Sequence, residues 1–141
     1  MNKYIKEDLP YSEETSLIIK SFYAVYNQLG HGFDAVLYKN ALVQELSKSN
    51  VKFEKDKIVP IYYDSVYVGE FIAEIVAYDV ILISIKSSLK IENADEQLLY
   101  SRLRNSGLRI GFLLNFGMKP EFIRKSPDDL PVTGLNDLPF D

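Results

Sequence analysis

The stretch between residues 51 and 88 most constrains what this chain of 141 residues can fold into. It reads VKFEKDKIVPIYYDSVYVGEFIAEIVAYDVILISIKSS and is dominated by Val, Ile, Tyr and Phe, which favour β-strands. Two short interruptions, Asp64-Ser65 and Tyr78-Asp79, divide it into three runs. Tight connections of this kind join antiparallel neighbours, so the stretch predicts a meander, with Pro60 marking an edge strand or a bulge. The predicted strands span residues 53–63, 66–76 and 80–86.

Helical patterns flank the meander on both sides. The segment SEETSLIIKSFYAVYNQL (12–29) has apolar residues at helical spacing, and Gly30 and Gly32 end it. A second helix is predicted over residues 34–50 and a third over residues 93–107. The predicted N-caps are Ser12, Asp34 and Asn93.

The last apolar segment adds a strand inside the sheet. LRIGFLLNFG (108–117) is almost wholly apolar, as in a buried strand, and EFIRK (121–125) is predicted to add a short edge strand. A strand, a helix and a further strand form a crossover that places the last strand inside the sheet. The predicted fold class is therefore α/β (α+β), a central mixed sheet of four to five strands flanked by helices. One domain is expected over residues 12–125, with an N-terminal extension (1–11) and a C-terminal tail (126–141).

Composition narrows the function classes. The chain has no cysteine and one histidine, so neither a disulfide framework nor a metal site built from these residues is expected. No segment reaches the roughly 20 apolar residues that cross a bilayer, and the polar N-terminus lacks the apolar core of a signal peptide, so a cytoplasmic protein is expected. The net charge of -4 argues against a large basic footprint on nucleic acid but leaves room for a local basic groove.

Ionisable residues on two neighbouring predicted strands form the candidate site. Alternation predicts that Glu74 shares a strand face with Ile72 and Val76, and that Lys86 shares one with Ser84. If the two strands are hairpin partners, Glu74 and Lys86 lie on the same face. A carboxylate among apolar neighbours must be paired or bound to metal. The spacing leaves two interpretations open: a Glu74–Lys86 ion pair, or a metal-and-lysine phosphodiesterase site.

Two further groups of polar residues have similarly open interpretations. Gln97 begins the third predicted helix, after Asp95 and Glu96, where polar residues usually cap the helix or are solvated. Five basic residues near one end of the predicted sheet either form a local patch or are ordinary surface charges. They are Lys86, Lys90, Arg102, Arg104 and Arg109.

Four blocks of the sequence resemble a known protein family. Their order along the chain is more specific evidence than any single block. They are VYNQLGHGFDAVLYKNALVQEL (25–46), KIVPIYYDSVYVGEFIAEIV (57–76), VILISIKSS (80–88) and EQLLYSRLRNSGLRIGFLLNFG (96–117). In this order they resemble the small bacterial GxxExxY proteins of the PD-(D/E)XK nuclease-like superfamily. The resemblance runs from about residue 12 to residue 125 and implies a restriction-endonuclease-like core. For active members it implies a site for Mg²⁺-dependent phosphodiester cleavage, in which carboxylates hold the cation and a lysine assists.

The resemblance carries five of the family's positions onto similar residues here. The signature glycine falls on Gly32 and the signature tyrosine on Tyr38. The strand aspartate falls on Glu74, which is longer by one methylene. The lysine of Glu-x-Lys falls on Lys86, and the helix glutamine falls on Gln97.

Two acidic positions of the family are neutral in this chain. The signature glutamate falls on Ala35, and the glutamate of Glu-x-Lys falls on Ser84. Glu74 is then the one acid left, and Mg²⁺ usually needs several carboxylates together with substrate oxygens. The resemblance therefore implies a degenerate site, with no cofactor or only weakly bound Mg²⁺.

Three functions remain open at this point. The favoured one is a catalytically inactive nuclease-like domain that acts as a binding or scaffold protein, with nucleic acid, another protein or a second copy as its partner and no membrane. The alternative is an altered Mg²⁺-dependent DNA or RNA nuclease built on Glu74, Lys86 and Gln97. A third is a domain whose resemblance is only structural, with an unrelated ligand. The acids considered as replacements in an altered nuclease are Glu70, Asp79 and Glu92.

Overall fold

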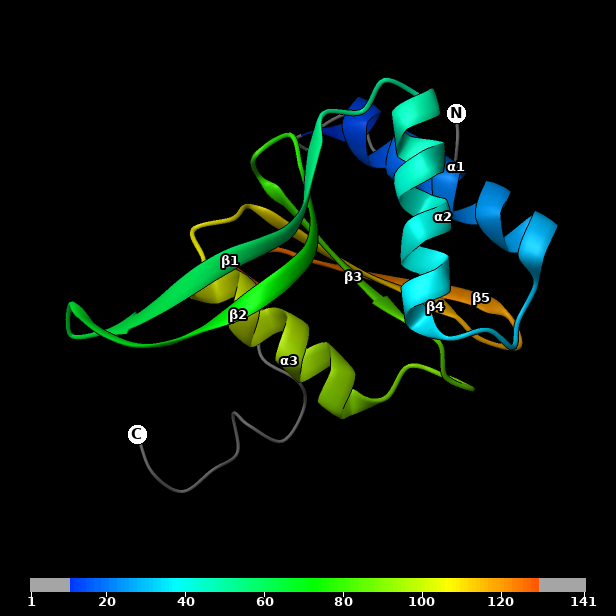
Figure 1. Ribbon diagram of the computed structural model, residues 1–141. Coiled ribbons are helices and arrows are strands. Elements are labelled where there is room, and N and C mark those ends of the chain that lie inside the picture. The colour runs from blue at the N-terminus through cyan, green and yellow to red at the C-terminus, as the bar shows by residue number, and fades with distance from the viewer. Residues whose placement is uncertain (1–10, 130–141) are drawn as a thin grey trace.

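The computed structural model describes residues 11–129, which form three helices and five strands (Figure 1). In chain order they are α1 (Ser12–Leu29), α2 (Ala35–Lys48), β1 (Phe53–Tyr63), β2 (Val66–Ala77), β3 (Ile81–Lys86), α3 (Asn93–Arg104), β4 (Ile110–Phe116) and β5 (Pro120–Lys125). Every predicted helix and strand is present. The predicted N-terminal extension and C-terminal tail lie largely outside the described residues.

The five strands form one mixed sheet in the order β1-β2-β3-β4-β5. β1, β2 and β3 are antiparallel neighbours, as their tight connections predict. β3 and β4 run parallel, with Ile81 opposite Ile110 and Lys86 opposite Asn115, because α3 carries the chain back between them. β5 pairs antiparallel with β4 and forms the other edge. The predicted α/β class, with a mixed sheet flanked by helices, is confirmed.

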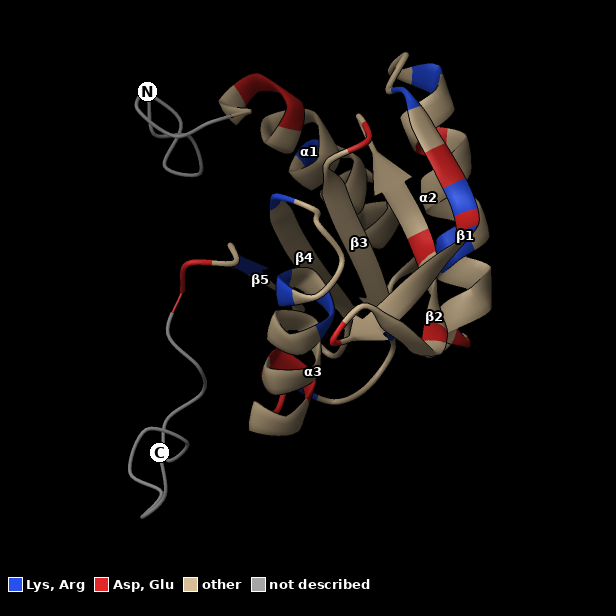
Figure 2. Cartoon of the chain, turned by 90° about the vertical axis from the view of Figure 1, so that its left-hand side faces the viewer, with Lys and Arg blue, Asp and Glu red and all other residues tan. Residues whose placement is uncertain are grey.

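Helices cover both faces of the sheet (Figures 1 and 2). α1 and α2 pack on one face, where Phe22 and Tyr38 belong to a large apolar cluster. α3 packs on the other face, where Leu103 belongs to a second cluster. Side chains of β3 alternate between the two clusters: Ile83 packs in the first and Leu82 in the second. A strand buried on both faces explains the nearly unbroken apolar run in this part of the sequence.

Two of the predicted helix caps are wrong by one residue. α1 begins at Ser12 itself, and its N-cap is Tyr11, which has a left-handed conformation with φ of 60°. α3 begins at Asn93, and its N-cap is Glu92. The Glu92 N–H donates a hydrogen bond to Oδ2 of Asp95 at 2.8 Å, which favours Glu92 over Asn93 as the cap. This bond also holds the Asp95 carboxylate in place on the first turn of α3.

β1 and β2 extend beyond the rest of the sheet as a two-stranded arm (Figure 1). β2 pairs with β3 only over residues 75–77, whereas it pairs with β1 along its whole length. Residues 58–72, called the arm below, therefore have no third strand beside them within the described chain. β1 is an edge strand of the sheet, as Pro60 predicts.

Candidate functional site

A small cleft of about 130 Å³ lies between the end of β3 and the first turns of α3. α3 contributes residues three or four positions apart, which share one face of the helix. The structure brings three of the predicted site residues together here: Glu74, Ser84 and Lys86. The full lining consists of Glu74, Ser84, Ile85, Lys86, Asp95, Leu98, Leu99, Arg102 and Leu113.

Glu74 lies where β2 separates from β3. The pairing of these strands ends at Ile75 and Ile83, so the ladder does not reach the backbone N–H of Ile85. That N–H donates instead to Oε2 of Glu74, at 3.1 Å. The carboxylate therefore occupies the position that a β2 carbonyl would have in a continued ladder.

β2 changes face at Glu74, which strict alternation does not predict. Ala73 packs in the cluster on the α3 side, but Ile75 packs in the cluster on the α1 and α2 side. Residues two apart in a strand normally share a face. Asp56, which lies on β1 between the partners of these two residues, has a positive φ of 54°. The predicted common face of Ile72, Glu74 and Val76 therefore holds for Glu74 and Val76, which both lie on the α3 side, but is wrong for Ile72, because the strand pair twists sharply at this point.

Lys86 forms an ion pair with Asp95 of α3. The predicted Glu74–Lys86 ion pair is not among the ion pairs of residues 11–129. The prediction that Lys86 forms an ion pair with Glu74 is therefore wrong. Asp95 is the partner because α3 packs beside the end of β3 and places the Asp95 carboxylate next to the Lys86 ammonium group.

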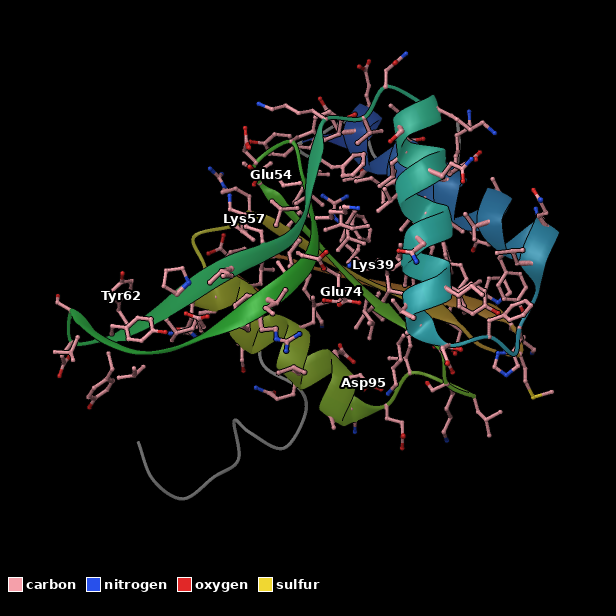
Figure 3. The ribbon with its side chains drawn as sticks, viewed as in Figure 1. Lys39, Glu54, Lys57, Tyr62, Glu74 and Asp95 are labelled. Carbon is pink, nitrogen blue, oxygen red and sulfur yellow. The ribbon has the colours of Figure 1, made fainter. Side chains whose placement is uncertain are left out.

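Burial raises the pKa of Glu74 above its ordinary value of 4.5. The hydrogen bond from the Ile85 N–H acts in the opposite direction, and so do two nearby cations. These are Arg102 of α3 and Lys39 of α2, which belong to the two layers on either side of the sheet (Figure 3). The desolvation of the carboxylate outweighs them.

The pKa of Asp95 lies below its ordinary value of 3.8. Burial acts to raise it, but the hydrogen bonds from Lys86 and from the Glu92 N–H, together with the lysine charge, outweigh burial. The two carboxylates of the cleft therefore differ: Asp95 is held ionised by its partners, whereas Glu74 is shifted toward its neutral form.

We expect Glu74→Gln to raise the stability of the protein at neutral pH. Because the folded-state pKa of Glu74 is raised, its contribution to stability is fully present below the unfolded-state value near 4.5 and is lost as the pH rises through the folded-state value. A glutamine can accept the same Ile85 hydrogen bond without burying a charge. Thermal melts should show the variant above the wild type at neutral pH, with the two converging below pH 4.5. A difference that does not depend on pH would contradict this explanation.

The two neutral positions lie in different surroundings. Ser84 lines the cleft and is 9% exposed, with Leu113 of β4 as its strand partner. Ala35 is the first residue of α2 and packs against the apolar cluster on the α1 and α2 side. Its methyl group has no atom that could ligate a metal. Neither position therefore adds a carboxylate to the cleft.

Gln97 does not line the cleft. Its Nε2 donates to Oγ of Ser101 at 3.3 Å, one turn further along α3, and its buried Oε1 has no hydrogen-bond partner among residues 11–129. Residues two apart on a helix do not face each other, so Gln97 and Asp95 point in different directions. The structure thus separates Gln97 from Glu74 and Lys86.

The three acids considered as replacement ligands in an altered nuclease also lie elsewhere. Glu70 accepts a hydrogen bond from the Tyr67 hydroxyl on the arm, at 2.6 Å. Asp79 pairs with Lys52 at 3.0 Å. Glu92 is the N-cap of α3. None of these three acids lines the cleft.

Asp95 is the cleft residue that sequence reasoning missed, because it was considered only as a helix-start residue. The available signal was the spacing of Asp95, Leu99 and Arg102. Intervals of four and three residues place an acid and a base on the apolar stripe of the helix, which is the stripe that faces the sheet.

The predicted basic residues do not gather into one patch. Lys86 and Arg102 line the cleft, and the Arg102 guanidinium also lies over the Phe71 ring, 4.9 Å from its centroid. Arg104 donates to the Tyr100 hydroxyl at 3.0 Å. Arg109 precedes β4 and so lies at the opposite end of the β3–β4 pair from Lys86. There it lines a separate cavity of about 650 Å³.

The residues of the cleft do not fit a divalent cation. Mg²⁺ requires several oxygen ligands, chiefly carboxylates and water. Within residues 11–129 no three His, Cys, Asp or Glu side chains converge as a metal site would require. Glu74 already accepts a backbone hydrogen bond, Asp95 is bound to Lys86, and Arg102 adds a second positive charge. The two negative charges of the cleft are thus balanced by two positive ones.

Gly32 and Tyr38, onto which the resemblance placed the signature glycine and tyrosine, act in the fold. Gly32 has a φ of 129°, which side chains rarely allow. The Tyr38 hydroxyl donates to the Gly30 carbonyl at 2.5 Å and accepts from the Phe33 N–H at 3.3 Å. Its ring stacks on Phe116, with centroids 4.3 Å apart. Together they fix the connection between α1 and α2 against the sheet.

The family comparison agrees with this arrangement of sheet, helices and cleft. A model of the PD-(D/E)XK nuclease superfamily matches residues 12–125. The chain therefore belongs to the PD-(D/E)XK nuclease superfamily. Neither the curated proteins nor the solved structures searched contain a match.

Proposed function

We propose that this chain is a catalytically inactive, GxxExxY-type nuclease-like domain that acts as a binding or scaffold protein. The observation that carries the proposal is the charge balance of the cleft. Glu74 and Asp95 already have hydrogen-bond and ionic partners within the protein, and Ser84 is the residue onto which the resemblance places the glutamate of Glu-x-Lys. Such a site has little excess negative charge with which to hold Mg²⁺.

Charge also favours a protein partner over nucleic acid. The net charge is -4, and Lys86 and Arg102 of the cleft face the two carboxylates rather than open solvent alone. Nucleic-acid affinity depends on clustered Lys and Arg that are free to neutralise phosphates. No helix within residues 11–129 is long and apolar enough to cross a membrane.

One observation favours the second candidate, an altered Mg²⁺-dependent phosphodiesterase. Asp95 supplies a carboxylate to the cleft that holds Glu74, so two acids are present if Lys86 releases Asp95. In such an enzyme, Lys86 would turn to the substrate phosphate. Gln97, the third residue first considered for this enzyme, would contribute only after moving toward the cleft.

A cleavage assay separates these candidates. Single- and double-stranded DNA and RNA are incubated with Mg²⁺ or Mn²⁺, beside a Glu74→Ala, Lys86→Ala double variant. We expect no metal-dependent cleavage by the wild type above the level of the double variant, with circular dichroism confirming that both are folded. Metal-dependent cleavage that disappears in the double variant would contradict the proposal and support the altered nuclease.

A further inference from the structure

The arm carries an unusual share of the exposed apolar surface. Thirteen large apolar side chains are exposed within the described residues, and seven of them lie on the arm, each between 54% and 71% exposed. They are Ile58, Tyr62, Tyr63, Val66, Tyr67, Val68 and Ile72. Monomeric proteins rarely leave a contiguous apolar patch of this kind uncovered, so the concentration points to an interaction surface.

One face of the arm is covered by the protein itself and the other is open. Val59 is buried on the α3 side, and Phe71 packs there beneath Arg102. Alternation puts the Ile58–Ile72 pair on the opposite face, where both residues are exposed. Further out, Tyr62 and Tyr67 pair across the strands, with ring centroids 6.2 Å apart (Figure 3).

A two-stranded hairpin is marginally stable in water when nothing packs on it. The arm extends well past the last β2–β3 pair, so its outer half receives no support from the sheet. A surface that covers its open face would stabilise it by removing aromatic and aliphatic side chains from water.

The charges of the arm argue against nucleic acid as that surface. Residues 58–72 contain two acids, Asp64 and Glu70, and no lysine or arginine.

The free edge of β1 is poorly suited to pairing with an added strand. Pro60 lacks a backbone N–H, and Asp56 breaks the regular edge with its positive φ. The open face of the arm, rather than its edge, is therefore the part suited to binding.

We propose that the open face of the arm binds the arm of a second copy of this chain, with the two arms antiparallel about a two-fold axis near Pro60. In this arrangement Asp64 at the tip of each arm lies beside Lys55 at the base of the other, because Lys55 and Asp64 are equally far from Pro60 to within one residue. Both side chains are exposed. The apolar side chains on either side of the axis then meet, Glu70 of each copy lies near the axis, and the ends are complementary in charge.

The open-face area fits a weak, reversible dimer. The pairing puts Ile58, Ile72, Tyr62 and Tyr67 on the open face and the Tyr63–Val66 pair on the other face. Four side chains that each expose on the order of 100 Å² provide roughly 400 Å² per copy, about half of what a standard interface buries per partner, so weak association is expected. The proposal concerns a surface away from the cleft and does not depend on whether the cleft has activity.

Sedimentation velocity over a wide range of protein concentration tests the dimer. We expect the wild type to dimerise reversibly, and the triple variant Ile58→Thr, Tyr62→Thr, Ile72→Thr to dimerise at least about tenfold more weakly. Threonine keeps β-propensity, and all three positions are exposed, so the fold is retained. The matched control replaces equally exposed residues off the arm: Val36→Thr, Leu89→Thr, Met118→Thr. A monomeric wild type, or equal loss in the control, would overturn the proposal.

A charge exchange tests the antiparallel arrangement. Asp64→Lys and Lys55→Asp should each weaken the dimer, because each places like charges together, and the double variant should restore it. Glu70 lies opposite Pro60, close to the proposed axis, so Glu70→Gln should tighten the dimer by removing repulsion between the two copies. Additive weakening in the double variant would overturn the antiparallel pairing.

Discussion

We expect Tyr38→Ala to lower the free energy of unfolding by about 3–5 kcal/mol, the cost of removing a large buried aromatic side chain. Tyr38 is fully buried and stacks on Phe116, with an angle of 12° between the rings. Its removal leaves a cavity between α2 and β4 and also frees the Gly30 carbonyl and the Phe33 N–H from their side-chain partner. The connection between α1 and α2 would then be held by fewer bonds.

Urea denaturation of two companion variants separates packing from hydrogen bonding. Tyr38→Phe keeps the stacked ring and should cost about 1–2 kcal/mol, because only the hydroxyl is lost. Tyr63→Ala, an exposed tyrosine on the arm, should lie within about 0.5 kcal/mol of the wild type when measured at concentrations where the protein is monomeric. A Tyr38→Ala variant as stable as Tyr63→Ala would refute the structural role assigned to Tyr38.

The second large effect is expected at Ser84. Ser84→Glu adds a third carboxylate to the small cleft, next to Glu74, where burial already disfavours charge. Without metal the variant should lose about 1–3 kcal/mol of stability, since a buried acid without a partner is costly. With Mn²⁺ or Mg²⁺ present it should recover, because the cation would be held by two carboxylates and would bind only the folded state.

Thermal melts with and without divalent cation measure this response. We expect a metal-dependent rise in melting temperature for Ser84→Glu and no such rise for the wild type. Ser84→Gln is the matched control, since it has nearly the same size without the charge, and it should not respond to metal. If the wild type or Ser84→Gln responds as strongly as Ser84→Glu, the absence of an acid at position 84 is not what limits metal binding.

The sheet was predictable from sequence because its signals are local. Asp64-Ser65 and Tyr78-Asp79 occupy the two tight turns, and all four residues have positive φ in the structure. Strand lengths and antiparallel pairing follow from the turns and from β-propensity. The parallel position of β4 follows from the crossover rule, which depends only on the order of the elements.

The candidate site was only partly predictable, because the face of Glu74 and the ionic partner of Lys86 both depend on tertiary packing. The face of Glu74 depends on a sharp twist opposite Asp56, and a period of two cannot reveal a twist. The partner of Lys86 depends on how α3 docks, and that brings Asp95 rather than Glu74 to the ammonium group. The site residues on β2 and β3 were found because a strand ladder fixes neighbours within a few ångströms.

The arm shows a different limit of sequence reasoning. The sequence marks Tyr62 and Ile72 as strand residues, because aromatic and β-branched side chains favour strands, but it does not predict whether they are covered. The structure leaves them exposed because β2 bends away from β3 after three paired residues. Local pattern marks which residues favour a strand, whereas the length over which a third strand accompanies it is set by the packing of the whole domain.

We infer that the cleft around Glu74 holds no catalytic divalent cation, and a titration of the wild-type protein with Mn²⁺ tests this inference. Free Mn²⁺ is followed by electron paramagnetic resonance, with Glu74→Ala and Asp95→Ala measured alongside. We expect no saturable site in the wild type that either variant removes. A single stoichiometric site in the wild type, lost in both variants, would contradict it and would show that Glu74 and Asp95 together bind the metal.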